Sequence, residues 1–326
     1  MTPRPAASLA VALAALVLAP AVPRALADGP SFESLLQQKS QAVVAVKFVL
    51  KTSFTVMGQA AQEQESNREV RGVLVDPSGL VMLSNSEFEA PGGMARFFRR
   101  QGAEVKSAPS DFKVLFGNEA KEHASVLVAR DSTLGLAFVQ VIAIQGAQGA
   151  AEGAAPAAAD LSKGAEPRVG QVLFGVTRKA RGFDCAPVID RLFVSGVVEK
   201  PRKMWSVSGA FNGLGLPVYD LATGVPVGVL SAQSGAEGVD EDGGAGAMLA
   251  ALSGGGDSVF VLPLDAVGKS VEAAKKRAPE AVEKATAAGK EPAKTEPPAS
   301  EPGMSEPGMS EPGMSGDAPK PPDAPK

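Results

Sequence analysis

Short runs of apolar and β-branched residues, separated by turn residues, fill the middle of the chain. Runs at 72–75, 80–83 and 136–139 are apolar, and the turns include Asp-Pro-Ser-Gly at 76–79 and Ala-Thr-Gly at 222–224. Short runs bounded by Gly, Pro, Asp and Ser are typical of antiparallel hairpins. About 200 residues carry this pattern, so the sequence predicts an all-β unit of that size.

Two segments have a helical period instead. Residues 31–39 place apolar side chains at helical spacing and predict a short leading helix. After Pro263 the apolar positions Val267, Val271 and Ala274 again follow a helical period. We expect a helical extension over residues 273–290, broken or kinked at Pro279 because proline lacks the amide donor that a helix needs.

Three stretches are expected to be loops. Residues 89–110, which include Arg-Phe-Phe-Arg-Arg at 96–100, form a long connection in this interpretation. Residues 144–164 are rich in Ala and Gly and predict a loose crossover, and residues 235–256 predict a Gly-rich insertion.

The C-terminal end differs in composition from the rest of the chain. From residue 291 onward it is rich in Pro, Glu, Ser, Gly and Lys, and Ser-Glu-Pro-Gly-Met is repeated at 300–304, 305–309 and 310–314. Such a composition buries too little apolar area to repay the entropy of ordering. We expect residues 291–326 to be disordered.

The N-terminal end reads as a secretory signal peptide. Arg4 precedes an apolar run at 6–22, and Ala-Leu-Ala at 25–27 stands before Asp28. This order of charge, apolar core and small residues is that of a cleaved signal. We expect residues 1–27 to be removed after Ala27, the mature protein to be secreted or periplasmic, and no integral membrane span to remain.

Composition excludes several classes of function. The net charge is −4, without the basic face that nucleic-acid binding needs. Cys185 is the only cysteine and His123 the only histidine, so neither an intrachain disulfide nor a cysteine-rich metal cluster can form. We predict no metal and no cofactor.

Several segments resemble, in order, those of trypsin-like serine proteases of the HtrA/DegP kind. They are RGVLVDPSGLVMLSN at 71–85, VARD at 128–131 with LAFV at 136–139, VGQVLFG at 169–175, VSGVV at 194–198, the stretch 213–230, and FVLPLDAV at 260–267. The resemblance implies two six-stranded antiparallel β-barrels, which we assign to residues 28–272. We expect no counterpart here to the PDZ domains of that family, because residues 273–326 are too few and too polar for one.

The resemblance also assigns the three catalytic positions of the family, and none holds the usual residue. Glu87 stands in the histidine position, Gly135 in the aspartate position and Leu214 in the serine position. A general base works best when its pKa lies near the operating pH. The ordinary pKa of a glutamate, about 4.3, is further from neutrality than that of histidine, about 6.5, so Glu87 is a poor replacement for the histidine. The sequence therefore predicts a degenerate triad.

The backbone of the family's oxyanion hole corresponds to Asn212, Gly213 and Leu214. Backbone amides can survive the loss of catalytic side chains, so this loop is a vestigial anion-binding site in our interpretation. Leu216 replaces the second glycine after the nucleophile.

A different catalytic constellation remains an alternative. It would have to use His123, with Cys185 or with a serine near the nucleophile strand: Ser206, Ser208 or Ser231. We favour the simpler interpretation, in which His123 is a surface or strand-edge residue and Cys185 is a small buried apolar side chain.

Together these observations predict an exported, catalytically inactive homologue that acts as a binding or scaffold protein. A peptide or protein ligand in the cleft between the barrels is the expected partner. The alternatives are an active serine endopeptidase or hydrolase with a non-standard site, and a structural surface domain that displays the tail.

Overall fold

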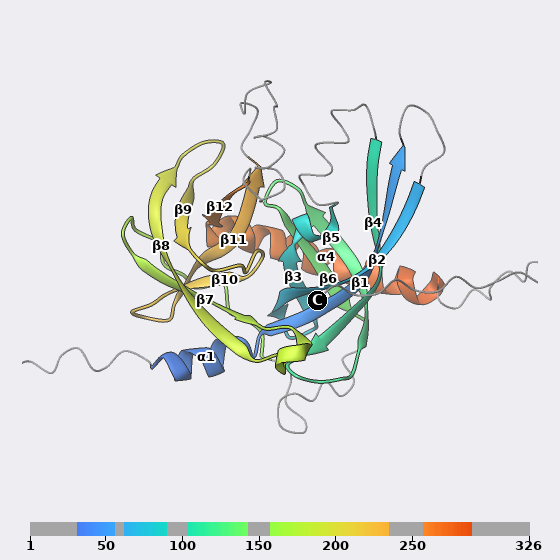
Figure 1. The fold of residues 1–326 in the computed structure, drawn as a ribbon, viewed down its shortest axis with the longest axis horizontal. Coiled ribbons are helices and arrows are strands. Elements are labelled where there is room, and N and C mark those ends of the chain that lie inside the picture. Colours follow the sequence, from blue (N-terminus) through green and yellow to red (C-terminus); the bar gives the residue numbers. More distant parts are fainter. Residues whose placement is uncertain (1–30, 56–61, 90–103, 143–156, 235–256, 289–326) are drawn as a thin grey trace, which may run out of the picture.

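The structure, a computed structural model, consists of two β-barrels and two flanking helices (Figure 1). It describes residues 31–55, 62–89, 104–142, 157–234 and 257–288. Each barrel is closed and has six antiparallel strands. The predicted fold class, an all-β protein of two six-stranded barrels with a C-terminal helix, is confirmed.

The first barrel has the strand order β1-β2-β3-β6-β5-β4. Its strands are β1 (Val43–Thr55), β2 (Gln62–Asp76), β3 (Leu80–Ser84), β4 (Glu104–Phe116), β5 (His123–Asp131) and β6 (Leu136–Val141). β1, β2 and β4 extend beyond the barrel as a three-stranded projection, which is visible in Figure 1.

The second barrel repeats this order, as β7-β8-β9-β12-β11-β10. Its strands are β7 (Val172–Arg178), β8 (Pro187–Val198), β9 (Met204–Gly209), β10 (Pro217–Asp220), β11 (Pro226–Ser234) and β12 (Asp257–Leu262). Closure pairs the strands all around each barrel, whereas in the projection β2 and β4 pair only with β1.

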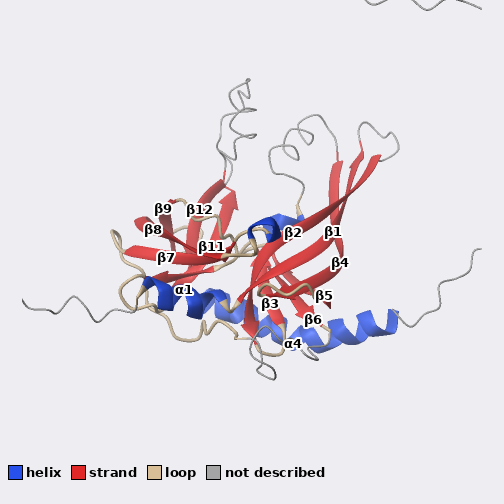
Figure 2. Ribbon diagram, turned by 60° about the horizontal axis from the view of Figure 1, so that its bottom comes forward, coloured by secondary structure: helices blue, strands red, loops and turns tan. Residues whose placement is uncertain are grey.

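Helix α4 (Leu264–Ala288) packs along one side of both barrels (Figure 2). Its buried side chains are Val267, Val271, Ala274 and Ala278, a helical spacing that presents one apolar stripe to the barrels. The helix continues through Pro279, so the predicted break is wrong. Packing against the barrel compensates for the hydrogen bond that proline cannot donate.

The predicted leading helix is confirmed as α1 (Phe32–Ser40). Ser31 caps its N-terminus, where the hydroxyl accepts a hydrogen bond from the amide of Ser34 at 3.2 Å. Leu35 is buried in a small cluster with Phe174 and Tyr219 of the second barrel.

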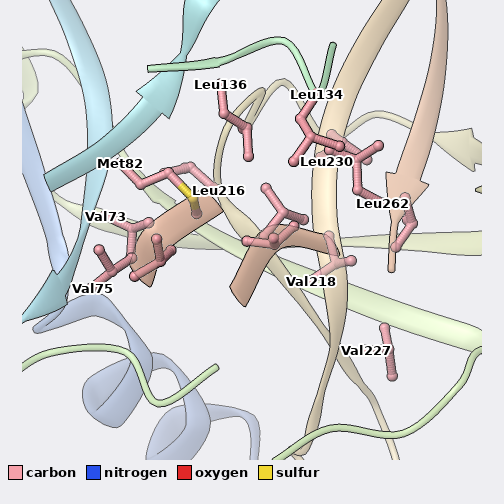
Figure 3. Close-up of a cluster of buried hydrophobic side chains, with 14 of the residues drawn as sticks. Val73, Val75, Met82, Leu134, Leu136, Leu216, Val218, Val227, Leu230 and Leu262 are labelled. Atoms are coloured by element: carbon pink, nitrogen blue, oxygen red, sulfur yellow. The ribbon is translucent and has the colours of Figure 1, made fainter. Parts of the chain in front are cut away.

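One apolar cluster joins the two barrels (Figure 3). Val73, Met82 and Leu136 come from the first barrel, and Val218 and Leu230 from the second. A continuous core of this kind makes the barrels one packing unit, because neither half can bury these side chains alone.

The predicted connection at 89–110 is too long. Residues 104–110 belong to β4, where exposed and half-buried positions alternate outside the barrel. That part of the strand carries few apolar residues, which is why the pattern was not visible in the sequence.

The predicted signal peptide and tail lie outside the described residues, as do 96–100 and 235–256. Within the described part of the chain, no helix has the length and apolar character to cross a membrane.

Candidate functional site

Three segments that are far apart in sequence meet where β3 ends. The amide of Asn85 donates to the carbonyl of Gly135 at 2.8 Å. Gly215 lies against the same backbone: a Cβ at this glycine would stand 2.3 Å from the nitrogen of Ser84. Leu214 immediately precedes Gly215, so the positions that the resemblance singled out belong to one junction between the barrels.

Glu87 lies in the short 3-10 helix η1 (Asn85–Phe88) that follows β3. The hydroxyl of Ser84 caps this turn. Burial raises the pKa of Glu87 above its ordinary value, and the positive charge of Arg68 opposes part of that shift. Its carboxyl group forms no hydrogen bond or ion pair with a residue that the structure describes.

Gly135 belongs to the β5–β6 turn, which is organised by the carboxylate of Asp131. One oxygen of Asp131 accepts from the amide and hydroxyl of Thr133 and from the amide of Leu134, at 3.1, 2.6 and 3.0 Å. The other accepts from the hydroxyl of Ser270 on α4 at 2.8 Å. Both oxygens of this carboxylate therefore accept hydrogen bonds, one within the turn and the other from α4.

The sequence did not single out Arg130 and Asn85, which form the strongest polar contact at the junction. The Arg130 Nε donates to the side-chain oxygen of Asn85 at 2.6 Å, and its guanidinium lies 5.7 Å from the centre of the Phe88 ring. Asn85 is buried. Because the two residues come from different hairpins, no local pattern links them.

The loop at 212–216 is held by backbone hydrogen bonds. The amide of Leu216 donates to the carbonyl of Gly213 at 2.9 Å, and that of Gly215 to the carbonyl of Leu230 at 2.7 Å. The amides of Gly213 and Leu214 donate to no acceptor in the described segments. Asn212 is exposed, Leu214 is half-buried, and Gly213 between them is buried.

Leu216 is fully buried between the barrels and is part of their shared core (Figure 3). It anchors the C-terminal side of the loop. Phe211 anchors the other side, since a Cβ at Gly213 would stand 2.1 Å from its ring.

His123 lies away from this junction. It begins β5, whereas the β5–β6 turn follows Asp131 at the other end of the strand, eight residues or about 26 Å away at the usual strand rise. Its side chain is buried, and its ring meets that of Phe116 edge-on with centroids 5.2 Å apart. Of the two expected positions, His123 occupies the strand edge, as the first residue of β5, and it is buried rather than on the surface.

Neither the candidate serines nor Cys185 pairs with the His123 ring, whose Nε2 has no hydrogen-bond partner among the described residues. Ser231 is buried and donates to the carbonyl of Leu134 at 2.8 Å, which ties the second barrel to the β5–β6 turn. Ser206 accepts from Ser195 at 3.2 Å. Cys185 is buried beside Arg178, which donates to its carbonyl at 3.2 Å.

Within the described ranges, no cluster of three or more His, Cys, Asp or Glu side chains is placed to hold a metal ion.

The two closed six-stranded barrels and their shared core define a double β-barrel protein, the architecture that the sequence resemblance implied. Among solved structures, the chain is similar to the apo protease domain of MamO from Magnetospirillum magneticum, with 13% sequence identity and a TM-score of 0.41. That similarity covers 72% of this chain and 97% of the MamO domain. No protein-family model and no curated protein matches the sequence.

Proposed function

We propose that this chain is an exported, catalytically inactive relative of trypsin-like serine proteases that acts by binding. The observation that carries the proposal is the place of its only histidine. His123 is buried at the far end of β5 from the junction, where a general base would have to act.

The side chains at the junction support the same proposal. Leu214 has no lone pair with which to attack a carbonyl group. In proteases of this type, loss of the serine or the histidine alone costs about 10⁶-fold in rate. Glu87 has a raised pKa but no hydroxyl or thiol within hydrogen-bonding distance in the described structure.

A peptide or protein segment bound between the barrels is the ligand that we propose. The amides of Gly213 and Leu214 support it, because they donate to no acceptor in the described segments and can donate to a carbonyl or carboxylate oxygen of a ligand. Such donors act without any catalytic side chain.

Incubation of the full chain with fluorescent unstructured peptides tests binding and cleavage together. We expect fluorescence anisotropy to rise while mass spectrometry finds the peptides intact. Leu214→Arg should weaken binding by placing a large charged side chain at the junction. Val197→Arg, on an exposed position of β8, is the matched control and should bind normally.

A fluorophosphonate probe tests inactivity directly. The full chain should remain unlabelled under conditions in which an active trypsin-like protease reacts completely, because labelling needs an activated nucleophile. Labelling that disappears in His123→Ala would establish the alternative, an active hydrolase. Peptide binding that is absent in every variant would favour a structural domain.

Export is proposed from the sequence of residues 1–27 and has its own test. When the gene is expressed with its leader in a bacterial host, the protein in the exported fraction should begin at Asp28. An exported protein that retains Met1 would contradict cleavage after Ala27.

A further inference from the structure

A cavity on the α4 side of the molecule is lined by several positively charged side chains. Its volume is about 520 Å³, within the range of ligand sites in proteins. Arg130 contributes from the end of β5, Arg202 from the turn between β8 and β9, and Lys269 and Arg277 from α4. The guanidinium of Arg130 already contacts Asn85 and lies 4.0 Å from Glu89, so the cations that remain for this cavity are Arg202, Lys269 and Arg277.

The cavity carries little negative charge to balance these cations. Asp131 is the one carboxylate in its lining, and hydroxyl and amide donors already surround it. Arg202, Lys269 and Arg277 form no ion pair with any residue that the structure describes. Concentrated charge of one sign in a hollow attracts a ligand of the opposite sign.

This cavity adjoins a larger one, with which it shares four lining residues. Arg202, Ala266, Lys269 and Ala273 also line a neighbouring cavity of about 1280 Å³. The shared residues make the two cavities adjacent along α4, and we call this combined surface the trough. Its larger part is lined by both signs of charge, with Lys203, Lys276, Glu166, Asp265 and Glu272, whereas the smaller part has an excess of cations. The combined shape suits an extended segment better than a single small ion.

We propose that residues 296–317 of the same chain bind along this trough through their carboxylates. Glutamates recur at every fifth position, 296, 301, 306 and 311, followed by Asp317. Neither Lys nor Arg occurs between residues 295 and 319. This stretch therefore carries five carboxylates and no cation, which complements a cavity whose lining has one carboxylate and an excess of cations.

The spacing of the charges is compatible on both sides. In the extended conformation that proline favours, five residues span about 15 Å. Lys269 and Arg277 are eight residues apart on α4, which corresponds to about 12 Å along the helix. Two successive glutamates can therefore face two of the cations at once.

The chain is also long enough to return to its own helix. From Arg277 to the end of α4 at Ala288 the distance is about 17 Å. The thirteen residues from Ala288 to Glu301 span up to about 40 Å when extended. The trough lies on the α4 side, so this contact does not require the junction between the barrels to bind or to cut anything.

Zero-length carbodiimide crosslinking of the full chain, followed by mass spectrometry, tests the contact. We expect Lys269 to be joined to glutamates of 296–311 in the monomer. Arg277→Glu should reduce these crosslinks about fivefold or more, the size of effect of a surface ion pair. Lys284→Glu, the same change two turns further along α4 and outside the cavity, should leave them unchanged.

Three results would overturn the proposal. One is equal crosslinking in Arg277→Glu, with circular dichroism confirming that the variant is folded. The second is crosslinks only between differently isotope-labelled copies, which would assign the tail to another molecule. The third is the absence of any crosslink between Lys269 and the tail glutamates in a sample in which the Lys47–Glu122 pair, 2.7 Å apart, crosslinks normally. In 1 M salt, where the screening length is about 3 Å, the tail crosslinks should disappear.

Discussion

At the scale of single residues, Gly215 matters most to the junction. It has a positive φ of 79° and lies directly on the backbone at Ser84. No other residue type meets both demands, because a Cβ is disfavoured by the backbone conformation and has no space. The closeness of the two barrels at this point depends on this residue.

Gly215→Ala should lower the free energy of unfolding by about 2 to 5 kcal/mol, the sum of backbone strain and overpacking. Gly170→Ala is the matched control. Its φ is also positive, at 84°, but nothing lies within 4 Å of its would-be Cβ, so it should cost only about 1 kcal/mol. Urea unfolding of both variants measures the difference; equal losses would refute the close contact.

Leu214→Ser alone should not create a protease. The new hydroxyl would lack an imidazole partner, because His123 remains at the other end of β5. We therefore expect the fluorophosphonate probe to leave this variant unlabelled, which is also the result expected for the parent chain. Labelling of Leu214→Ser would show that our assignment of the serine and histidine positions is wrong.

At the scale of secondary-structure elements, α4 is held to the first barrel by polar contacts as well as by its apolar stripe. Ser270 donates to Asp131, and Lys275 forms an ion pair with Asp76 at 3.1 Å. Burial acts to raise the pKa of Asp131, but the hydrogen bonds from Thr133, Ser270 and Leu134 outweigh it and keep the pKa below the ordinary value of 3.8.

The lowered pKa of Asp131 predicts a pH-dependent contribution to stability. A carboxyl group with a lower pKa in the folded state stabilises the protein above its unfolded pKa, and the contribution is lost as pH falls through the folded value. Asp131→Asn should therefore cost about 1 to 3 kcal/mol at pH 7. The difference from the parent chain should shrink as the pH falls below 3.8.

Urea unfolding at neutral and acid pH measures that difference. Ser270→Ala is the control that removes one donor and leaves the carboxylate, and it should cost less than Asp131→Asn at neutral pH. A difference between the parent chain and Asp131→Asn that is constant across the pH range would contradict the assigned role of the charge.

At the scale of the whole molecule, the two barrels share one core and should respond together to a change within it. Leu216→Ala should destabilise the chain by about 2 to 5 kcal/mol, the usual cost of a leucine-sized cavity. Leu50→Ala, in a cluster confined to the first barrel, should cost a similar amount.

Hydrogen exchange distinguishes the two variants. Leu216→Ala should increase amide exchange in β3 and β6 of the first barrel and in β10 and β11 of the second. Leu50→Ala should do so only within the first barrel. If both variants affected one barrel alone, the shared core would not couple the two halves.

The sequence by itself predicted an all-β unit, a leading helix and a C-terminal helix, and the ordered resemblance implied two barrels. The β pattern and the helices follow from local rules, because apolar periodicity and turn residues act within a few residues. The polar outer part of β4 and the continuation of α4 through Pro279 did not follow from these rules. The same local matches located Glu87, Gly135 and Leu214, which the fold then brings to one junction.

Only the tertiary structure decided which side chains become partners. In the folded chain His123 is buried, Asp131 accepts a hydrogen bond from α4, and Arg130 donates one to Asn85. Arg202, Lys269 and Arg277 line one cavity. Each of these contacts joins elements that are distant in sequence, so no local pattern encodes it. Burial and charge pairing depend on what the rest of the chain places beside a residue, and that is fixed only when the barrels and α4 pack together.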